Sequence, residues 1–410
     1  MHKIATPLVS VVAICLLGSI LAVSVNGAAL NVGSGSQYKS ITEAINAAQP
    51  GDTISISSGT YSENVVVTKP ITIKAASPGS TVVTAADPSK DVFLVQGQNI
   101  HIEGLTITGA TGASGVHVDH SSACFVTGIS AHGNVRAVYL DGATNCEVSS
   151  SNLADNGYGV YCDYASNNAI SSNVATGEQG HGNTLGDGIY MFYSDDNTVT
   201  HNNLSANHVF GISLFHSSSN TITNNSILKN EDIGVRLRES NNNTLTFNAI
   251  SGNVNMGILS ITVTGDHIYL NNFVSQPNPL SEAQGNVLNS PQQLSYTFGG
   301  ATHTGYMGNY FSDYKGNDAN GTGIGSPASG YGDKYPLVQP FEKYTNIVAA
   351  SVTSSTTASS ASTQPSNLTS DNATSSSAAQ TSTPGFDMGA AFLAITLAAF
   401  ILAYSRVRRH

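Results

Sequence analysis

Short apolar strands recur along the central part of the chain at a nearly constant interval. A small residue precedes each strand, and successive small residues are 22, 22, 29, 23, 23 and 23 positions apart. The first and third residues that follow are mostly apolar, an alternation with period two that is typical of half-buried strands. The small residues, which define position zero of the repeat, are Gly115, Ala137, Gly159, Gly188, Gly211, Gly234 and Gly257. A repeat of this length indicates a solenoid.

Asparagine recurs at two further positions of the repeat. Position nine is Cys124 and Cys146 in the first two coils and asparagine in the next four. Position nineteen is asparagine except in the coil with the 29-residue interval. Stacked amides bond to one another along a β stack, and asparagine tolerates the left-handed conformation of a tight corner. We therefore predict an all-β fold, a right-handed single-stranded parallel β-helix of about ten coils of 22–23 residues.

A short N-terminal helix is expected to cover the first coil. Ser40 and Glu43 form a capping-box pattern that opens a helix over 41–48, and Pro50 and Gly51 end it. Such a helix would shield the strand edge of the first coil from aggregation. We therefore assign the β-helix to residues 28–345 and a closing segment within it to residues 295–345.

Both ends of the chain are predicted to direct its localisation. Residues 1–27 have a polar start, an apolar run and then small residues, the pattern of a secretory signal peptide. Residues 346–383 are expected to form a disordered stalk, because serine and threonine occupy 20 of the 33 positions from residue 351 onward. Asn367 and Asn372 begin glycosylation sequons in this stalk. Residues 384–410 contain an apolar run followed by arginines, which suits a membrane anchor.

The charge balance disfavours one class of partner. The chain has 15 Lys and Arg against 26 Asp and Glu, a formal net charge of −11. A nucleic-acid partner is not expected, because it needs a basic face to neutralise its phosphates. The three cysteines of the body include no Cys-x-x-Cys pair. Cys124 and Cys146 share a repeat position, which suits core packing, a disulfide between adjacent coils or, third, a copper site.

Several segments resemble known families. Residues 38–53 and 58–67 resemble the opening of secreted β-helix proteins of the pectin-lyase-like superfamily, and the asparagine-rich repeats resemble the NosD or CASH type. Residues 308–325 and 333–337 are similar to the closing segment of archaeal NosD-type surface proteins. The sequence Thr-Pro-Gly-Phe at 383–386, with the apolar run and arginines after it, resembles the archaeal PGF-CTERM sorting signal. That resemblance implies cleavage by an archaeosortase and a lipid anchor, the alternative being a retained membrane span.

The outward-facing positions of the repeat carry aromatic rings and carboxylates. Positions two, four and five are predicted to lie on one face of the solenoid, where sugar rings could stack on aromatic faces and carboxylates could bind hydroxyls. We therefore predict a polysaccharide-binding groove, with a decorated β surface as the alternative. The substrate-binding candidates are His117, Tyr139, Tyr161, Tyr164, Tyr190 and Tyr193.

Catalytic candidates lie on the same face and in one insertion. Asp119, Asp141 and Asp163 stand one coil apart, so they should repel one another, bind calcium or form the acid–base pair of a glycosidase. The alternative is that they are solvated and unpaired. His181 lies within Gly-His-Gly in the 29-residue coil and is a further catalytic candidate.

The closing segment contains a second candidate for calcium. Asp318, Asn320 and Thr322 offer oxygen ligands at alternate positions, and Gly323 stands at the sixth position of the loop. No glutamate occupies the twelfth position, so a turn that seals the solenoid is the alternative. Copper is not expected, because the histidines and methionines form no His-x-His or Met-rich cluster.

The combined pattern predicts a secreted, monomeric protein anchored to the surface of an archaeal cell. Its β-helix is expected to bind a polysaccharide or surface glycan, or to serve as a structural part of the envelope or S-layer, without catalysis. The first alternative is a polysaccharide lyase or glycoside hydrolase that acts on the same face. The second is a NosD-like accessory protein in copper-enzyme maturation, since the resembled family includes adhesins, lyases, hydrolases, epimerases and such a protein.

Overall fold

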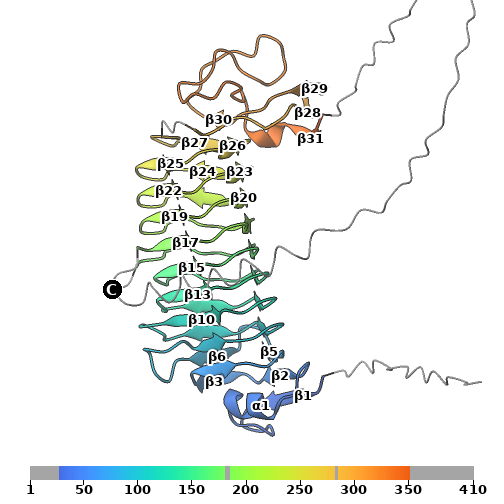
Figure 1. Cartoon of the computed structure of the whole chain (residues 1–410), viewed down its shortest axis with the longest axis vertical. Coiled ribbons are helices and arrows are strands. Elements are labelled where there is room, and N and C mark those ends of the chain that lie inside the picture. The colour runs from blue at the N-terminus through green and yellow to red at the C-terminus, as the bar shows by residue number, and fades with distance from the viewer. Residues whose placement is uncertain (1–26, 181–184, 282–284, 351–410) are drawn as a thin grey trace, which may run out of the picture. The chain divides into compact units, whose positions relative to one another are not determined.

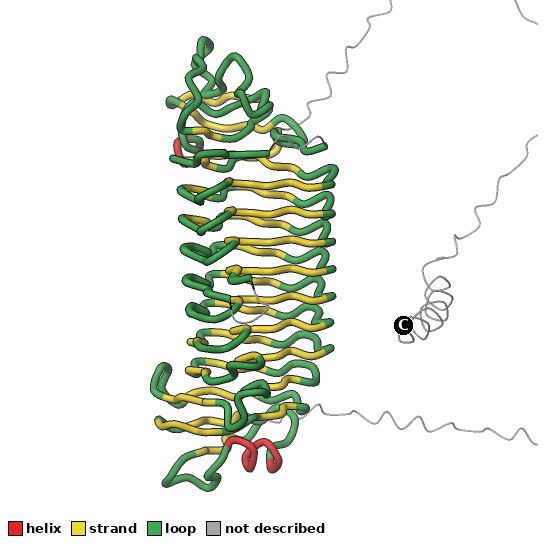
Figure 2. The backbone as a smooth tube through the Cα atoms, turned by 90° about the vertical axis from the view of Figure 1, so that its left-hand side faces the viewer, coloured by secondary structure: helices red, strands yellow, loops and turns green. Residues whose placement is uncertain are grey.

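The computed structural model is a parallel β-helix whose coils have three sides, two of them covered by long parallel sheets and the third by short strands and bridges (Figure 1). Figure 2 shows the strands stacked in layers along the solenoid. The longest sheet contains 11 parallel strands, in line with the predicted all-β solenoid. The structure describes residues 27–180, 185–281 and 285–350.

The strands of the first sheet are β1 (Ala29–Val32), β2 (Thr53–Ile56), β5 (Thr72–Ala75), β8 (His101–Glu103), β11 (Phe125–Thr127), β14 (Glu147–Ser149), β16 (Ala169–Ser171), β18 (Thr198–Thr200), β20 (Thr221–Thr223), β23 (Thr244–Thr246) and β26 (His267–Tyr269). Those of the second sheet are β4 (Val65–Val67), β7 (Phe93–Val95), β10 (Ser114–Asp119), β13 (Arg136–Asp141), β15 (Tyr158–Asp163), β17 (Asp187–Phe192), β19 (Phe210–Phe215), β22 (Ile233–Arg238) and β25 (Met256–Ile261).

The third side of the solenoid consists of two short parallel sheets. One contains β3 (Gly59–Ser62), β6 (Thr81–Thr84), β9 (Thr106–Thr108) and β12 (Ser130–His132). The other contains β21 (Ser226–Leu228), β24 (Ala249–Ser251), β27 (Asn272–Val274) and β30 (Tyr310–Phe311). Single parallel bridges at Asn152, Val174 and Asn203 connect the two, so the pairing continues along this side.

The core follows from the alternation along each strand. Val116 and Val118 of β10 are fully buried, and their equivalents in the other coils form one continuous apolar column inside the solenoid. Position zero is small because a larger side chain there would meet the backbone of the next coil. A Cβ atom on Gly159 would lie 2.5 Å from the carbonyl oxygen of Gly188 in the next coil, which is closer than real Cβ contacts allow.

The expected capping helix is present as α1 (Ile41–Ala47). The Ser40 side chain accepts a hydrogen bond from the Glu43 amide, and the Glu43 carboxylate accepts one from the Ser40 amide, which confirms the capping box. At the other end, Lys69 donates to three of the last backbone carbonyls. The apolar side of α1 is therefore fixed against the first coil.

The closing segment forms an antiparallel sheet of β28 (Leu294–Phe298), β29 (Ala301–Gly305) and β31 (Thr345–Ala349). A short 3-10 helix, η1 (Phe341–Lys343), precedes β31 in the chain. It has its own small core around Tyr296, Met307 and Leu337. Because β31 pairs with β28 as far as Ala349, the folded body extends beyond the expected boundary at residue 345.

Buried asparagines hold the corners of the solenoid together. Asn220 at position nine donates to Asn243 Oδ1 in the next coil at 2.9 Å through its backbone amide, and its side-chain amide donates to the carbonyls of Ser194 and Ser218. The expectation that these asparagines are themselves left-handed is wrong. The positive φ belongs to the preceding residue, as at Ser219 (60°) and Asn242 (57°), because the asparagine side chain must point inward to bond.

Two features of these ladders were not expected from the sequence. A third ladder follows five residues after position nine: Asn173, Asn202, Asn225, Asn248, Asn271 and Asn309. In the 29-residue coil, Glu178 fills the gap at position nineteen. Its Oε2 accepts the Asn156 amide at 2.7 Å, and its own amide donates to Asn207. Burial raises the pKa of Glu178 well above its ordinary value.

Several predictions fall on residues that the structure does not describe. They concern nearly all of the signal peptide, His181, the stalk from residue 351 onward with Asn367 and Asn372, and the 384–410 segment. Within the described residues, no helix has the length and apolar character needed to cross a membrane.

Candidate functional site

The predicted columns of aromatic and acidic residues form on the outer side of β10, β13, β15 and β17. Tyr139 pairs in register with Tyr161, and Tyr161 with Tyr190. Asp141 stands between Asp119 and Asp163 in the neighbouring column. We call this surface the tyrosine–aspartate face, and its members are Ser114, His117, Asp119, Arg136, Tyr139, Asp141, Tyr158, Tyr161, Asp163, Asp187 and Tyr190.

The aromatic rings of this face pack mainly on one another. His117 stacks on Tyr139 with ring centroids 4.4 Å apart, and Tyr161 stacks on Tyr190 at 5.1 Å. Tyr139 meets Tyr161 edge to face at 5.4 Å. The expectation that sugars stack on these ring faces therefore needs correction, because neighbouring rings cover much of the faces. The hydroxyl-bearing edges remain for polar contacts.

A further column lies on this face that the sequence analysis did not single out. Arg136, Tyr158 and Asp187 occupy the position just before the small residue, in register across three coils. The Arg136 guanidinium lies over the rings of Tyr139 and Tyr161, at 4.7 and 4.9 Å from their centroids. The sequence signal was the run of polar and aromatic residues at this position, which strict alternation would have turned toward the core.

The ionisable groups of these columns differ in the direction in which their surroundings shift the pKa. A hydrogen bond from His120 is the main factor that lowers the pKa of Asp119. Burial, together with the charge of Asp141, raises the pKa of Asp163. Burial also raises the pKa of Tyr158 to about 12 and that of Asp187 to about 7. The face therefore combines one firmly ionised carboxylate with carboxyls that hold a proton more readily.

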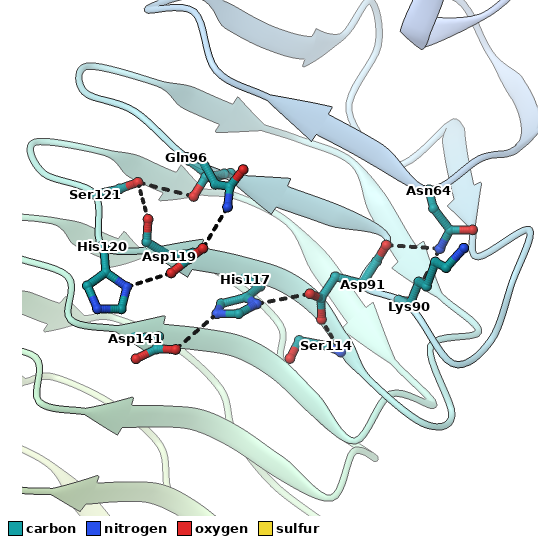
Figure 3. A network of polar contacts seen from close by, with 11 residues as sticks. Asn64, Lys90, Asp91, Gln96, Ser114, His117, Asp119, His120, Ser121 and Asp141 are labelled. Atoms are coloured by element: carbon teal, nitrogen blue, oxygen red, sulfur yellow. Dashed lines mark hydrogen bonds and ion pairs between the residues drawn. The ribbon is translucent and has the colours of Figure 1, made fainter. Parts of the chain in front are cut away.

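A chain of polar contacts marks the N-terminal end of the face (Figure 3). His117 Nδ1 lies 2.9 Å from Asp91 Oδ2, and His117 Nε2 lies 3.6 Å from Asp141 Oδ2. Asp119 accepts hydrogen bonds from Gln96 Nε2 at 2.7 Å and pairs with His120 Nδ1 at 2.6 Å. The three residues His117, Asp119 and Asp141 bring one ligand atom each within 4.8 Å of one another.

Five buried polar atoms of the face have no hydrogen-bond partner among the residues that the structure describes. They are Ser114 Oγ, His117 Nε2, Arg136 Nε, Asp163 Oδ1 and Asp187 Oδ2. Tyr139 donates at 3.3 Å to the other oxygen of Asp163, so only one side of that carboxylate is used. Unpaired buried polar groups are rare in native proteins, and a bound ligand or water is one explanation for them.

The remaining candidates lie elsewhere. Tyr164 and Tyr193 stack on each other at 5.1 Å at the corner beside the face, both with positive φ. In the closing segment, the two carboxylate oxygens of Asp318 accept the backbone amides of Thr322 and Gly323 at 2.9 and 2.7 Å, whereas Asn320 is exposed. Asp318 thus closes a turn, and calcium binding there stays a prediction.

The described cysteines are free thiols inside the solenoid. The backbone amide of Cys124 donates to Cys146 Sγ at 3.4 Å, so sulfur takes the place of the asparagine oxygen in the ladder. The contact between the two thiols lowers the pKa of Cys124 and raises that of Cys146. The structure therefore shows packing, and no disulfide between these coils.

The stacked parallel sheets define the class of the fold, a parallel β-helix. The chain belongs to the NosD family: the family model, described as periplasmic copper-binding protein (NosD), matches residues 45–186 and 181–316. A cell surface glycoprotein of Methanothermus fervidus is 30% identical to the chain over 99 residues. This match covers 24% of the chain and only 16% of that glycoprotein.

Solved structures share the fold at low sequence identity. Tailspike protein 2 of bacteriophage CBA120 superimposes with a TM-score of 0.51 at 12% identity, over 65% of this chain and 47% of that one. An alginate lyase from Paenibacillus gives a TM-score of 0.47 at 18% identity, over 60% of this chain and 93% of that one.

The family description raises the question of copper. In the part of the chain that the structure describes, the one group of three or more potential metal ligands is His117, Asp119 and Asp141. It offers one nitrogen and two oxygens, whereas Cu(I) prefers sulfur ligands. The sulfurs of Cys124 and Cys162 lie in the core. The described residues therefore do not fit a sulfur-rich copper site.

Proposed function

We propose that the tyrosine–aspartate face binds a polysaccharide or surface glycan without cleaving it. The observation that carries the proposal is the concentration of unpaired buried polar atoms on one ladder of strands, including Arg136 Nε and Asp163 Oδ1. A polyhydroxylated chain lying along the face would supply donors and acceptors at each coil. Hydrogen bonds to charged groups contribute about 1.5–3 kcal/mol each.

The location proposed for this activity is the outer surface of an archaeal cell. The support is the signal-peptide pattern of residues 1–27, the similarity to a cell surface glycoprotein and the family description as periplasmic. Anchoring through residues 384–410, by a lipid after sorting or by a retained span, is part of the same proposal. The partners would then be envelope or S-layer glycans and an archaeosortase-type enzyme.

The test is a binding assay of the full chain against a panel of acidic and neutral polysaccharides. The double substitution Arg136→Gln with Asp163→Asn should weaken binding at least about tenfold, because each removes a charged group that we expect to bond the glycan. The control is Thr198→Ala, which changes an exposed outward position on β18 of the first sheet. Equal binding by the double variant and the wild type would refute the role of the face.

The same assay separates binding from catalysis. New reducing ends or unsaturated products in the wild-type reaction would replace the proposal with a lyase or hydrolase, in which Asp119, Asp141 and Asp163 would be the first residues to test. Binding without product supports the proposal. Absence of both would leave a structural role in the envelope.

A further inference from the structure

The cluster of His117, Asp119 and Asp141 has the geometry of a small metal site. His117 and Asp119 are two residues apart on β10, so their side chains leave the same face of the strand. Asp141 is the direct partner of Asp119 on β13. The fourth corner of this rectangle is Tyr139, whose ring stacks on His117 and holds the imidazole plane in place.

The histidine is oriented for coordination. Asp91 Oδ2 lies 2.9 Å from His117 Nδ1, and this carboxylate also accepts the Ser114 amide at 2.8 Å. With Nδ1 donating to Asp91, Nε2 carries the lone pair. Nε2 is buried and has no hydrogen-bond partner among the described residues, and it points toward Asp141 (Figure 3). A carboxylate behind a histidine is the usual arrangement at protein metal centres.

The distances suit a small ion. A tetrahedral zinc ion with bonds of about 2.0–2.1 Å requires ligand atoms about 3.4 Å apart. His117 Nε2 and Asp141 Oδ2 are already 3.6 Å apart. The Asp119 oxygen completes a triangle whose sides are all below 4.8 Å, so a small rotation of that side chain would bring it into range. Each oxygen of Asp119 already has one contact, with Gln96 or His120, and keeps a second lone pair for a metal ion.

We propose that His117, Asp119 and Asp141 bind one zinc ion, with Asp91 as the residue that positions the imidazole. Zinc is preferred over calcium because calcium takes six to eight oxygen ligands, whereas this cluster offers one nitrogen and two carboxylates. The positive ion also offsets the repulsion between Asp119 and Asp141, which stand side by side on adjacent coils. The site does not depend on glycan binding.

The experiment is a calorimetric titration of the full chain, without a histidine tag, with Zn²⁺ in the absence of polysaccharide. One ion should bind per chain. His117→Gln and Asp141→Asn should each weaken binding by at least about tenfold, and Asp91→Asn by about tenfold through the imidazole. Millimolar Ca²⁺ should not displace the zinc. The matched control is His208→Gln, since His208 also pairs with a carboxylate, Glu231, at 2.8 Å, but lies outside the cluster.

Three results would overturn the proposal: no zinc binding by the wild type, binding that His117→Gln and Asp141→Asn leave unchanged, or an equal loss in His208→Gln. Circular dichroism and urea denaturation establish that each variant is folded. If the substitutions impair folding, Co²⁺ added to the wild type provides the test. The visible absorption of a tetrahedral site with nitrogen and oxygen ligands is expected, and its absence counts against the site. A glycan assay that fails while zinc binds would refute only the proposed function.

Discussion

The interior and the outer face of the same coils both stack equivalent side chains in register. They differ in how completely these side chains are hydrogen-bonded within the protein. Inside, Asn202 donates to Ile170 and Asn225 and accepts from Asn173, so the buried amide is fully used within the protein. Outside, Asp163 has one oxygen without a partner among the described residues. The difference teaches that stacking alone does not define a role. An unpaired atom on the outer face indicates a place for a ligand, whereas the unpaired oxygens of Glu178 and Asp266 are enclosed in the interior ladders.

Removal of one interior amide should have the largest effect. Asn202→Ala breaks the ladder at several hydrogen bonds and leaves the Asn173 amide without its acceptor. We expect a loss of about 3 kcal/mol or more in the free energy of unfolding, measured from the urea midpoint and slope. The adjacent exposed Asn203→Ala should change it by less than about 0.5 kcal/mol. Equal effects would mean that the ladder does not stabilise the solenoid.

The end of one ladder offers a pH-dependent contrast. Asp266 accepts the Asn243 amide at 2.8 Å, and burial raises its pKa from 3.8 to about 6. Because the pKa of Asp266 is higher in the folded state, its contribution to the free energy of unfolding is fully present below about pH 4. It is lost as the pH rises toward 6, since this carboxyl ionises first in the unfolded state. Asp266→Asn should therefore stabilise the protein by about 2 kcal/mol at pH 7 and by little at pH 4.

Urea denaturation at both pH values measures this difference. Exposed Asp196→Asn serves as the control, because it makes the same chemical change at the same side of the solenoid, three coils away. A gain for Asp266→Asn that is as large at pH 4 as at pH 7 would contradict the assignment of the effect to ionisation.

On the outer face, substitution should affect stability much less. Asp163→Asn removes a negative charge that Asp141 repels. The asparagine side chain has the same shape and can still accept the hydrogen bond from the Tyr139 hydroxyl. We expect a change within about 1 kcal/mol, toward higher stability at pH 7. Thermal and urea denaturation measure it. A loss as large as that of Asn202→Ala would place Asp163 among the structural residues and remove it from the proposed glycan site.

The smallest effect is expected where sulfur replaces asparagine in a ladder. Asn168 Oδ1 already accepts a hydrogen bond from the Cys146 backbone amide, and Cys146 Sγ lies near the carbonyls of Ser121 and Thr144. An amide at this position would reach the same groups, so Cys146→Asn should change the free energy of unfolding by less than about 1 kcal/mol. A loss above 2 kcal/mol would show that the two cysteine coils pack differently from the asparagine coils.

Much of the candidate site was visible in the sequence. The pairing of Tyr139 with Tyr161 and of Asp119 with Asp141 follows directly from the repeat interval, because equivalent residues of adjacent coils must stack. The position of Arg136 was missed. Its side chain reaches the face only because the strand departs from strict alternation at position zero, where Ala137 is skipped in the register with β15.

The sequence by itself determined the solenoid, its coil interval and its capping helix. These features depend on local sequence patterns and on the repeat, because equivalent residues of adjacent coils must stack in register. Only the tertiary structure decided which groups are satisfied. The asparagine corners, the occupied aromatic faces and the approach of Asp91 and Asp141 to His117 depend on side-chain directions across three coils, and residue spacing does not fix these directions.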